Sequence, residues 1–249
     1  MPSKWINPKP PSHHRPEYEK LVPKYWNWLL DKEEIVDNPI YSFDGEGGEE
    51  VFFMRAEYDY VNRWENSLDG SFPTITRKNI PINRVGGGEY TFVTGRNIFL
   101  PVIDTIVTDL LKDASGMPLT PKLMDEILGT ENSDVQEKIK HGRIRSMIRR
   151  LDNGKESYDD LVSDLETYMF PQIKDENRPF SLSIPEDSKL AGHLEFEFPR
   201  GSKPLEARAQ GVYVIFEIKE PGRYQIRSAA EGMRGYASNM NYQIQIKSG

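Results

Sequence analysis

The sequence predicts a mainly β protein, an antiparallel β-sandwich or jelly-roll-like domain with an inserted helical segment at about residues 105–170. The strongest observation is that apolar and other residues alternate in residues 212–218, 224–228 and 242–246. A period of two places one set of side chains on the buried face of a sheet. Turn signals such as Glu220-Pro221-Gly222 separate these segments, as expected for successive antiparallel strands.

The first 23 residues are predicted to form an extended, proline-rich arm outside a single β-rich domain of residues 24–249. Prolines throughout this stretch fix φ and remove backbone donors, which disfavours a regular helix. Trp5, Ile6 and Tyr18 lie among the prolines, and a purely solvating tail would be poorer in aromatic residues. We therefore predict that these three residues dock on a second copy of the chain or on a protein partner, as in domain exchange.

An aromatic segment follows the arm and is predicted to form a short helix that ends before Asn38-Pro39. Tyr25, Trp26 and Trp28 are candidates for ligand binding, because aromatic faces stack on the apolar faces of sugars. The alternative interpretation is that these rings anchor the core, since tryptophans are mostly buried and Leu29 and Leu30 adjoin them.

The first half of the chain contains few strand signals. Apolar, β-branched and aromatic residues predict strands at residues 50–56, 90–94 and 97–103. Pro101 lies inside the third segment, which predicts a sheet edge or a bulge there. These strands are too few to close a core alone, so one domain interrupted by helices is favoured over two domains.

Three helices are predicted in the middle of the chain. The first is capped by Thr120, has Pro121 at its first position and ends at Gly129. The second is expected from residue 133 to about residue 151, and the third from about residue 157 to Pro171, each starting at a capping motif.

A possible metal site lies in the segment His193-Leu194-Glu195-Phe196-Glu197. In a strand, His193, Glu195 and Glu197 share one face at steps of about 7 Å. Imidazole and carboxylate ligands suit iron, manganese or zinc, so a divalent metal is one open alternative and no other cofactor is predicted. The competing interpretation is a solvated strand face opposite the core residues Leu194 and Phe196.

Bulk composition excludes several classes of function. A net charge of -7 and a pI near 5.3 argue against a general nucleic-acid binder. The absence of cysteine excludes disulfides, thiolate nucleophiles and zinc-thiolate sites. No apolar run approaches the ~20 residues of a transmembrane segment. The N-terminus as written has no signal peptide, which favours the cytoplasm and leaves open a mature exported form.

Both ends of the chain resemble an uncharacterised family of bacterial and archaeal proteins. Tyr25-Trp26-Asn27-Trp28-Leu29-Leu30 is similar to the family's W-x-W-L-L segment, and Ile98-Phe99-Leu100-Pro101-Val102 to its I-F-F-P-V motif. Pro221-Gly222-Arg223-Tyr224-Gln225-Ile226 is similar to its P-G-x-H-x-I strand, and Met240-Asn241-Tyr242-Gln243-Ile244 to its final strand. The resemblance implies a β-rich fold and brings no established function. Family members commonly carry cysteines and a secretion signal, and neither is seen in this sequence.

The leading functional prediction is a non-enzymatic binding or structural protein that assembles through its N-terminal arm. No Ser/His/Asp order, H-E-x-x-H or G-x-S-x-G motif supports nucleophilic or zinc-dependent hydrolysis. Two alternatives stay open. One is a metal-dependent enzyme of the jelly-roll type that uses the His193 and Glu195 strand face, and the other is a carbohydrate-binding module.

Overall fold

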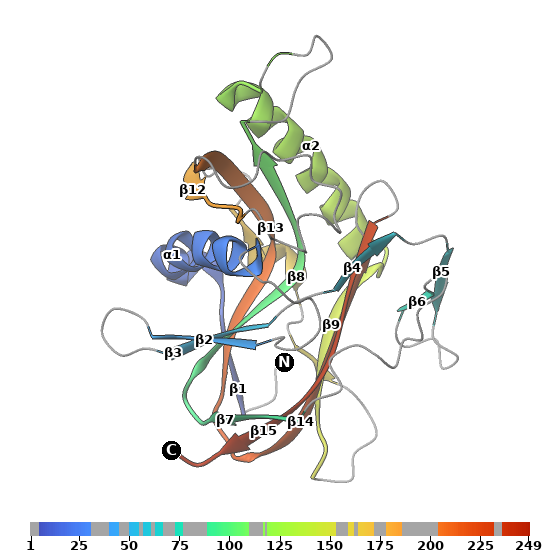
Figure 1. Ribbon diagram of the computed structural model, residues 1–249. Helices are drawn as coiled ribbons and strands as arrows, with labels where there is room; N and C mark the ends of the chain where they lie inside the picture. The colour runs from blue at the N-terminus through green and yellow to red at the C-terminus, as the bar shows by residue number, and fades with distance from the viewer. Residues whose placement is uncertain are drawn as a thin grey trace.

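The computed structural model is a sandwich of two β-sheets with one helix, α1, lying over the outer face of the first sheet (Figure 1). It describes residues 5–30, 40–44, 50–54, 57–60, 63–66, 73–76, 89–109, 117, 119–152, 159–161, 164–171, 178–185, 204–231 and 236–249. The predicted mainly β sandwich with a helical insertion is confirmed, whereas the jelly-roll form of the prediction is not.

Sheet A, the larger sheet, is built on two long antiparallel strands, β8 (Asn97–Thr108) and β13 (Leu205–Ile218). Strands β3 and β2 extend the sheet beyond β8, and β1, β11 and β12 pair one after another with the opposite edge of β13. The bounds of these short strands are β1 (Ile6–Lys9), β2 (Ile40–Asp44), β3 (Glu50–Met54), β11 (Met169–Phe170) and β12 (Phe180–Leu182).

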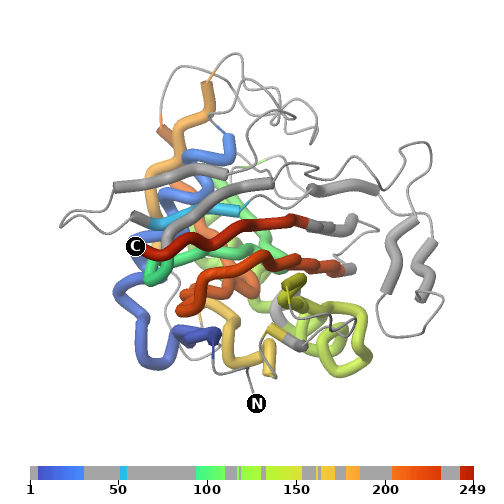
Figure 2. The backbone as a smooth tube through the Cα atoms, turned by 90° about the horizontal axis from the view of Figure 1, so that it is seen from below, coloured from blue at the N-terminus to red at the C-terminus, as the bar shows by residue number. Residues whose placement is uncertain are grey.

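Sheet B has the strand order β10-β9-β14-β15-β4, with β7 also paired to β15. Figure 2 shows its central pair, β14 and β15, running side by side in orange and red. The predicted alternation is confirmed there, since Tyr224, Ile226 and Ile244 point into the core between the sheets. The bounds are β4 (Glu57–Tyr60), β7 (Glu89–Val93), β9 (Ile144–Arg150), β10 (Asp159–Asp160), β14 (Gly222–Glu231) and β15 (Tyr236–Lys247). A separate hairpin consists of β5 (Arg63–Asn66) and β6 (Pro73–Thr76).

Strand β13 is buried on both faces, which explains its nearly continuous apolar sequence. Val212, Val214 and Phe216 face the core between the two sheets. Tyr213 and Ile215 face the opposite way, into a second core beneath α1. Sheet A is therefore the middle layer of three.

The bulge expected at Pro101 is confirmed. Val212 pairs with Ile103, but the next residue, Tyr213, pairs with Pro101, so Val102 is an extra residue on β8. Val102 and Ile103 both point into the core between the sheets, as two consecutive residues do at a bulge. A bulge lets an interior strand of the sheet contain a proline.

Helix α1 spans Pro11–Leu30, so the prediction of an extended arm over residues 1–23 is wrong for most of its length. Pro11 occupies the first helical position, where no backbone donor is needed. The helix kinks at His14 (φ -126°, ψ 25°), and Pro16 follows in the first turn after the kink. Only Pro23 lies in the helix interior, where a proline normally removes one hydrogen bond.

The energetic reason for α1 is its apolar stripe. Tyr18, Leu21, Val22, Tyr25 and Leu29 recur at helical spacing, and all of them are buried against sheet A. Each large buried side chain contributes about 1.5–3 kcal/mol relative to an exposed one. This burial outweighs the cost of one interior proline, about 3 kcal/mol.

Helix α2 spans Pro121–Lys140 and begins as predicted, with the Thr120 side chain accepting a hydrogen bond from the Leu123 backbone N–H at 3.3 Å. Gly129 does not end it, because a helix tolerates one glycine at a cost of about 1 kcal/mol. The helix ends at Lys140, and Gly142, which follows the His141 cap, has a positive φ of 68°, as is common just after a helix. The predicted helix from residue 133 to 151 is thus wrong beyond Lys140.

Residues Ile144–Arg150 form strand β9 because they pair with β14, although Ile144, Met147 and Ile148 have the i, i+3, i+4 spacing of a helix. Ile144 and Ile148 face the core, and Arg145 and Arg149 alternate with them. The third predicted helix is also wrong in its described part. There the chain forms β10, a short 3₁₀ turn (Leu165–Tyr168) that Asp164 caps, and β11.

Helix α2 packs over the far ends of β8 and β13, on the side of sheet A that also faces sheet B. The Arg208 guanidinium pairs with Asp125 (Nη1–Oδ1 2.9 Å), and the Gln210 side chain donates to the Leu128 carbonyl. Within the described part of the chain, neither α-helix is long and apolar enough to cross a membrane.

Candidate functional site

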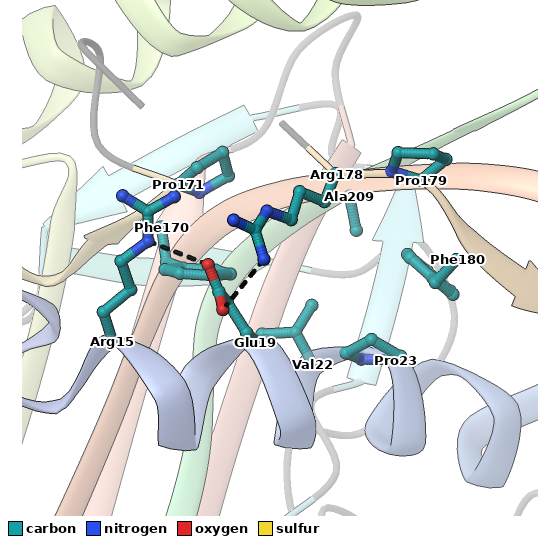
Figure 3. Close-up of a pocket in the computed structure, with 10 residues that line it drawn as sticks. All are labelled: Arg15, Glu19, Val22, Pro23, Phe170, Pro171, Arg178, Pro179, Phe180 and Ala209. Carbon is teal, nitrogen blue, oxygen red and sulfur yellow. Dashed lines mark hydrogen bonds and ion pairs between the residues drawn. The ribbon is translucent and has the colours of Figure 1, made fainter. Parts of the chain in front are cut away.

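A cavity of about 210 Å³ lies between α1 and the short strands β11 and β12 (Figure 3). Figure 3 shows α1 forming one side, with the ends of β11 and β12 facing it across the opening. The residues that line it are Arg15, Glu19, Val22, Pro23, Phe170, Pro171, Arg178, Pro179, Phe180 and Ala209. We refer to this cavity as the α1 pocket.

The α1 pocket lies where the edge of β13 is only partly paired. Phe170 of β11 pairs with Gly211, and Phe180 of β12 pairs with Ala207. Ala209 lies midway between these two pairs and lines the pocket. The pocket therefore lies beside the stretch of β13 between its pairings with β11 and β12, under a helix.

The walls of the α1 pocket are mostly apolar. Val22, Phe170, Pro171 and Ala209 are buried, and Phe180 is half-buried. Figure 3 shows the rings of Phe170 and Phe180 on either side of the opening. Such walls favour an apolar body, and polar groups at the rim then fix its orientation.

Two guanidinium groups share one carboxylate at the rim. Arg15 Nε lies 2.8 Å from Glu19 Oε1, and Arg178 Nη1 lies 3.6 Å from Glu19 Oε2 (Figure 3). Arg15 and Glu19 are one helical turn apart, a spacing at which side chains on α1 meet. Among the rim residues that the structure describes, two positive charges and one negative charge give a net charge of +1. Arg178, with a side chain 69% exposed, is the more open of the two cations.

Asn27 fixes α1 against β12 beside the α1 pocket. Its Nδ2 donates to the Ser181 carbonyl at 3.0 Å, and its Oδ1 accepts from the Ser183 N–H at 2.9 Å. One side-chain amide thus pairs with the backbone of the strand on both sides of Leu182. The distance between the helix and the strand is set by this pair of hydrogen bonds.

Tyr18 fixes the beginning of α1 against β13. Its hydroxyl donates to the Lys9 carbonyl at 2.7 Å and accepts from the Ile215 N–H at 3.2 Å. Lys9 and Ile215 are paired residues of β1 and β13, so the hydroxyl sits between two strands of the ladder. Burial raises the pKa of this phenol well above its ordinary value, which keeps the donor proton in place.

The predicted aromatic ligand site is part of the core instead. Tyr25, Trp26 and Trp28 are 0%, 3% and 7% exposed. Tyr25 packs on Phe53 and Phe99 with ring centroids 5.9 and 5.3 Å apart. These rings present no open face on which a sugar could stack, because α1 turns them toward sheet A.

The residues predicted to dock on a partner contact their own chain. The Trp5 ring lies on Tyr224, with centroids 4.9 Å apart, and Ile6 pairs with Ile218 at the edge of β13. Tyr18 of α1 is fully buried against sheet A. Docking of these residues on a second copy stays a prediction, and it would require exchange of β1 and α1 between copies.

The predicted metal ligands His193, Glu195 and Glu197 lie outside the described residues. Among the residues that are described, no group of three His, Asp or Glu side chains is placed to hold a metal ion. The divalent metal therefore stays an untested prediction.

Sequence reasoning missed the residues of the α1 pocket. One local signal was present, the Arg15 and Glu19 spacing on a helix, but it was hidden by the expectation of an extended arm. Arg178 is far away in sequence, and only the pairing of β12 with β13 brings it near Glu19. Comparisons with protein-family models, with curated proteins and with solved structures found no match.

Proposed function

We propose that this chain is a non-enzymatic binding protein whose α1 pocket takes a small ligand with one anionic group and an apolar body. The observation that carries the proposal is the net charge of +1 at the rim of an apolar cavity. This is the binding form of the function predicted from the sequence, and it requires no catalytic residue.

The charges at the rim divide into two parts with different roles. Arg15 and Glu19 form a close pair at 2.8 Å that is electrically neutral as a unit. Arg178 lies farther from Glu19, at 3.6 Å, and supplies the excess positive charge. A guanidinium has five N–H donors in a planar fork that matches a carboxylate, so Arg178 is the expected contact of the ligand's anionic group.

The apolar walls define the remainder of the ligand. Phe170 and Phe180 offer ring faces and edges, and Val22 offers an aliphatic surface between them. A flat apolar group that enters this space exchanges water for carbon contacts, at about 25 cal/mol per Å² of apolar area buried. An aromatic or branched aliphatic carboxylate therefore fits both parts of the α1 pocket.

Calorimetric titration with 3-phenylpropionate, and with its uncharged analogue 3-phenylpropionamide, tests the proposal. We expect the carboxylate to bind more tightly than the amide. Arg178→Gln should weaken carboxylate binding by up to about fivefold, because an exposed ion pair contributes about 0.2–1 kcal/mol. Glu19→Gln should strengthen it, since the competing carboxylate is removed.

The matched control is Lys20→Gln, which removes one positive charge from an exposed position on the same helix outside the α1 pocket. It should leave the affinity for 3-phenylpropionate unchanged. Equal binding of the carboxylate and the amide would contradict the proposal, and so would equal losses in Lys20→Gln and Arg178→Gln.

A further inference from the structure

We infer that the ligand of the α1 pocket is an apolar α-amino acid in its zwitterionic form, whose carboxylate contacts Arg178 and whose ammonium group contacts Glu19. This inference rests on the proposed function and specifies the class of ligand. It comes from the position of the Glu19 carboxylate, which lines the cavity and lies between two guanidinium groups at the rim (Figure 3).

Arg178 and Glu19 present opposite charges side by side at the rim. Arg178 Nη1 lies 3.6 Å from Glu19 Oε2, which is longer than a good hydrogen bond. A guanidinium has five donors and a carboxylate has about four lone-pair sites, so this one contact leaves each group able to bind a ligand as well. On the other side, Arg15 Nε holds Glu19 Oε1 at 2.8 Å and so fixes the position of the carboxylate.

The head group of an α-amino acid carries the same two charges on neighbouring groups. One Cα joins its ammonium nitrogen to its carboxylate carbon, so these two atoms are about 2.5 Å apart. When the carboxylate lies on Arg178 and the ammonium group on Glu19, the four charges alternate in sign around a ring. Each ligand group then forms charge-assisted hydrogen bonds, which are stronger than those between neutral groups.

A ligand with a carboxylate alone lacks this arrangement. Its carboxylate would contact Arg178 close to the carboxylate of Glu19, and two like charges near each other repel. An ammonium group beside the ligand carboxylate replaces that repulsion with an attraction to Glu19. Glu19 is therefore the residue that selects an amino acid over a simple carboxylic acid.

The cavity sets the size and the side chain of this amino acid. Its volume of about 210 Å³ is below the about 300–1,000 Å³ that is usual for drug-sized ligands, which favours a ligand of one residue. Phe170 and Phe180 lie on either side of the opening, and Val22 and Ala209 add aliphatic surface. An aromatic or branched aliphatic side chain thus finds carbon contacts while its head group stays at the charged rim.

Three compounds test this inference by calorimetric titration: L-phenylalanine, 3-phenylpropionate, which lacks the ammonium group, and 2-phenylethylamine, which lacks the carboxylate. We expect L-phenylalanine to bind most tightly, by up to about fivefold over 3-phenylpropionate, the range for one exposed ion pair. Glu19→Gln should weaken the binding of L-phenylalanine by up to about fivefold, whereas it should strengthen that of 3-phenylpropionate. Because one affinity rises as the other falls, a misfolded variant cannot produce this result.

The matched control is Glu17→Gln, which removes the same charge from α1 at a residue that does not line the cavity. The Glu17 carboxylate interacts with the His14 ring instead, with Oε1 3.1 Å from Nδ1. This variant should leave the affinities for L-phenylalanine and 3-phenylpropionate unchanged. Equal losses of L-phenylalanine binding in Glu17→Gln and Glu19→Gln would overturn the inference.

The remaining outcomes separate the two proposals. If 3-phenylpropionate binds at least as tightly as L-phenylalanine, or if Glu19→Gln strengthens the binding of both, the ammonium contact is overturned while the proposed function stands. If 2-phenylethylamine binds as tightly as L-phenylalanine, the carboxylate contributes nothing, and both the inference and the proposed function are wrong. The same holds if none of the three compounds binds.

Discussion

The two faces of sheet A are covered by different partners and have different chemistry. The face toward sheet B is filled largely by isoleucine, valine and leucine side chains from both sheets. The face toward α1 is richer in aromatic rings, among them Tyr25, Phe53, Phe99 and Tyr213. Sheet B covers the first of these faces with regular strands, whereas α1 covers only part of the second face.

This difference explains where the α1 pocket lies. Aromatic side chains can have polar tips that need partners, and on the α1 face Trp26 Nε1 donates to the Tyr213 hydroxyl at 3.2 Å. The helix extends beyond the fully paired part of β13 and ends over β12. The space left at that margin is the pocket, so the α1 face stabilises the fold and also contains the proposed binding site.

The largest expected effects on stability come from two neighbouring residues of β8 whose side chains face opposite cores, Phe99 and Leu100. Phe99→Ala should lower the free energy of unfolding by about 3–5 kcal/mol, and Leu100→Ala by about 2–5 kcal/mol. Phe99 packs on Tyr25, Phe53 and Tyr213 beneath α1, so only its loss should also weaken 3-phenylpropionate binding. Urea unfolding and calorimetry measure the two quantities. A similar loss of affinity in folded Leu100→Ala would contradict the separation of the faces.

A second expected effect concerns the close approach of β13 and β8 at Gly211. A Cβ at this position would lie 2.3 Å from the Ile103 carbonyl oxygen and 2.7 Å from Asp104 Cα. Gly211→Ala should therefore lower the free energy of unfolding by about 1–3 kcal/mol.

The control is Gly129→Ala in α2, where a Cβ meets nothing within 4 Å and the helix gains propensity. This variant should be more stable than the parent by about 0.4–1 kcal/mol. Urea unfolding of both variants tests this difference. If Gly211→Ala and Gly129→Ala both stabilised or both destabilised the fold, the close approach of β13 to β8 would be contradicted.

Removal of one hydroxyl tests how α1 is held. Tyr18→Phe leaves the buried Ile215 N–H without its acceptor, at a cost of about 1–3 kcal/mol. Tyr224 lies on β14, in the core between the two sheets. Tyr224→Phe loses one hydrogen bond to the Glu220 carbonyl near the surface and should cost about 0.5–1.5 kcal/mol. Thermal and urea unfolding measure both losses. A larger loss of unfolding free energy in Tyr224→Phe than in Tyr18→Phe would contradict this expectation.

Alkaline pH should weaken the fold through its buried tyrosines. Burial raises the pKa of Tyr213, and burial together with Asp164 raises the pKa of Tyr168 to about 12. A phenol whose pKa is higher in the folded state binds its proton more tightly there, so stability is full below about pH 10 and falls above it. Each such tyrosine contributes a slope of about 1.4 kcal/mol per pH unit above its unfolded pKa. Unfolding measured from pH 8 to about pH 11 should show a shallower fall in Tyr213→Phe.

The sequence predicted the elements whose signal is local and periodic. The alternation in residues 224–228 and 242–246 appears in sheet B, and Pro101 marks the bulge. It failed where two signals competed. In residues 11–23 the prolines predict an extended arm, but the helical stripe of Tyr18, Leu21 and Tyr25 prevails, because two of the three prolines in this helix occupy harmless first-turn positions.

The α1 pocket was beyond sequence reasoning for a different reason. Arg178, Phe180 and Ala209 meet α1 only because β12 pairs with β13 in one register. No local spacing of residues in the sequence predicts this tertiary contact. Burial of the predicted sugar-stacking rings likewise depends on which face of α1 turns toward sheet A.

The most direct test of the account is a map of amide resonance shifts for the ¹⁵N-labelled chain titrated with 3-phenylpropionate. We expect shifts that saturate together and cluster at Arg15 and Val22 on α1 and at Phe170, Phe180 and Ala209, with the strands β14 and β15 unaffected. Shifts centred on sheet B, or none at all, would contradict the claim that the helix-covered face of sheet A is the binding face.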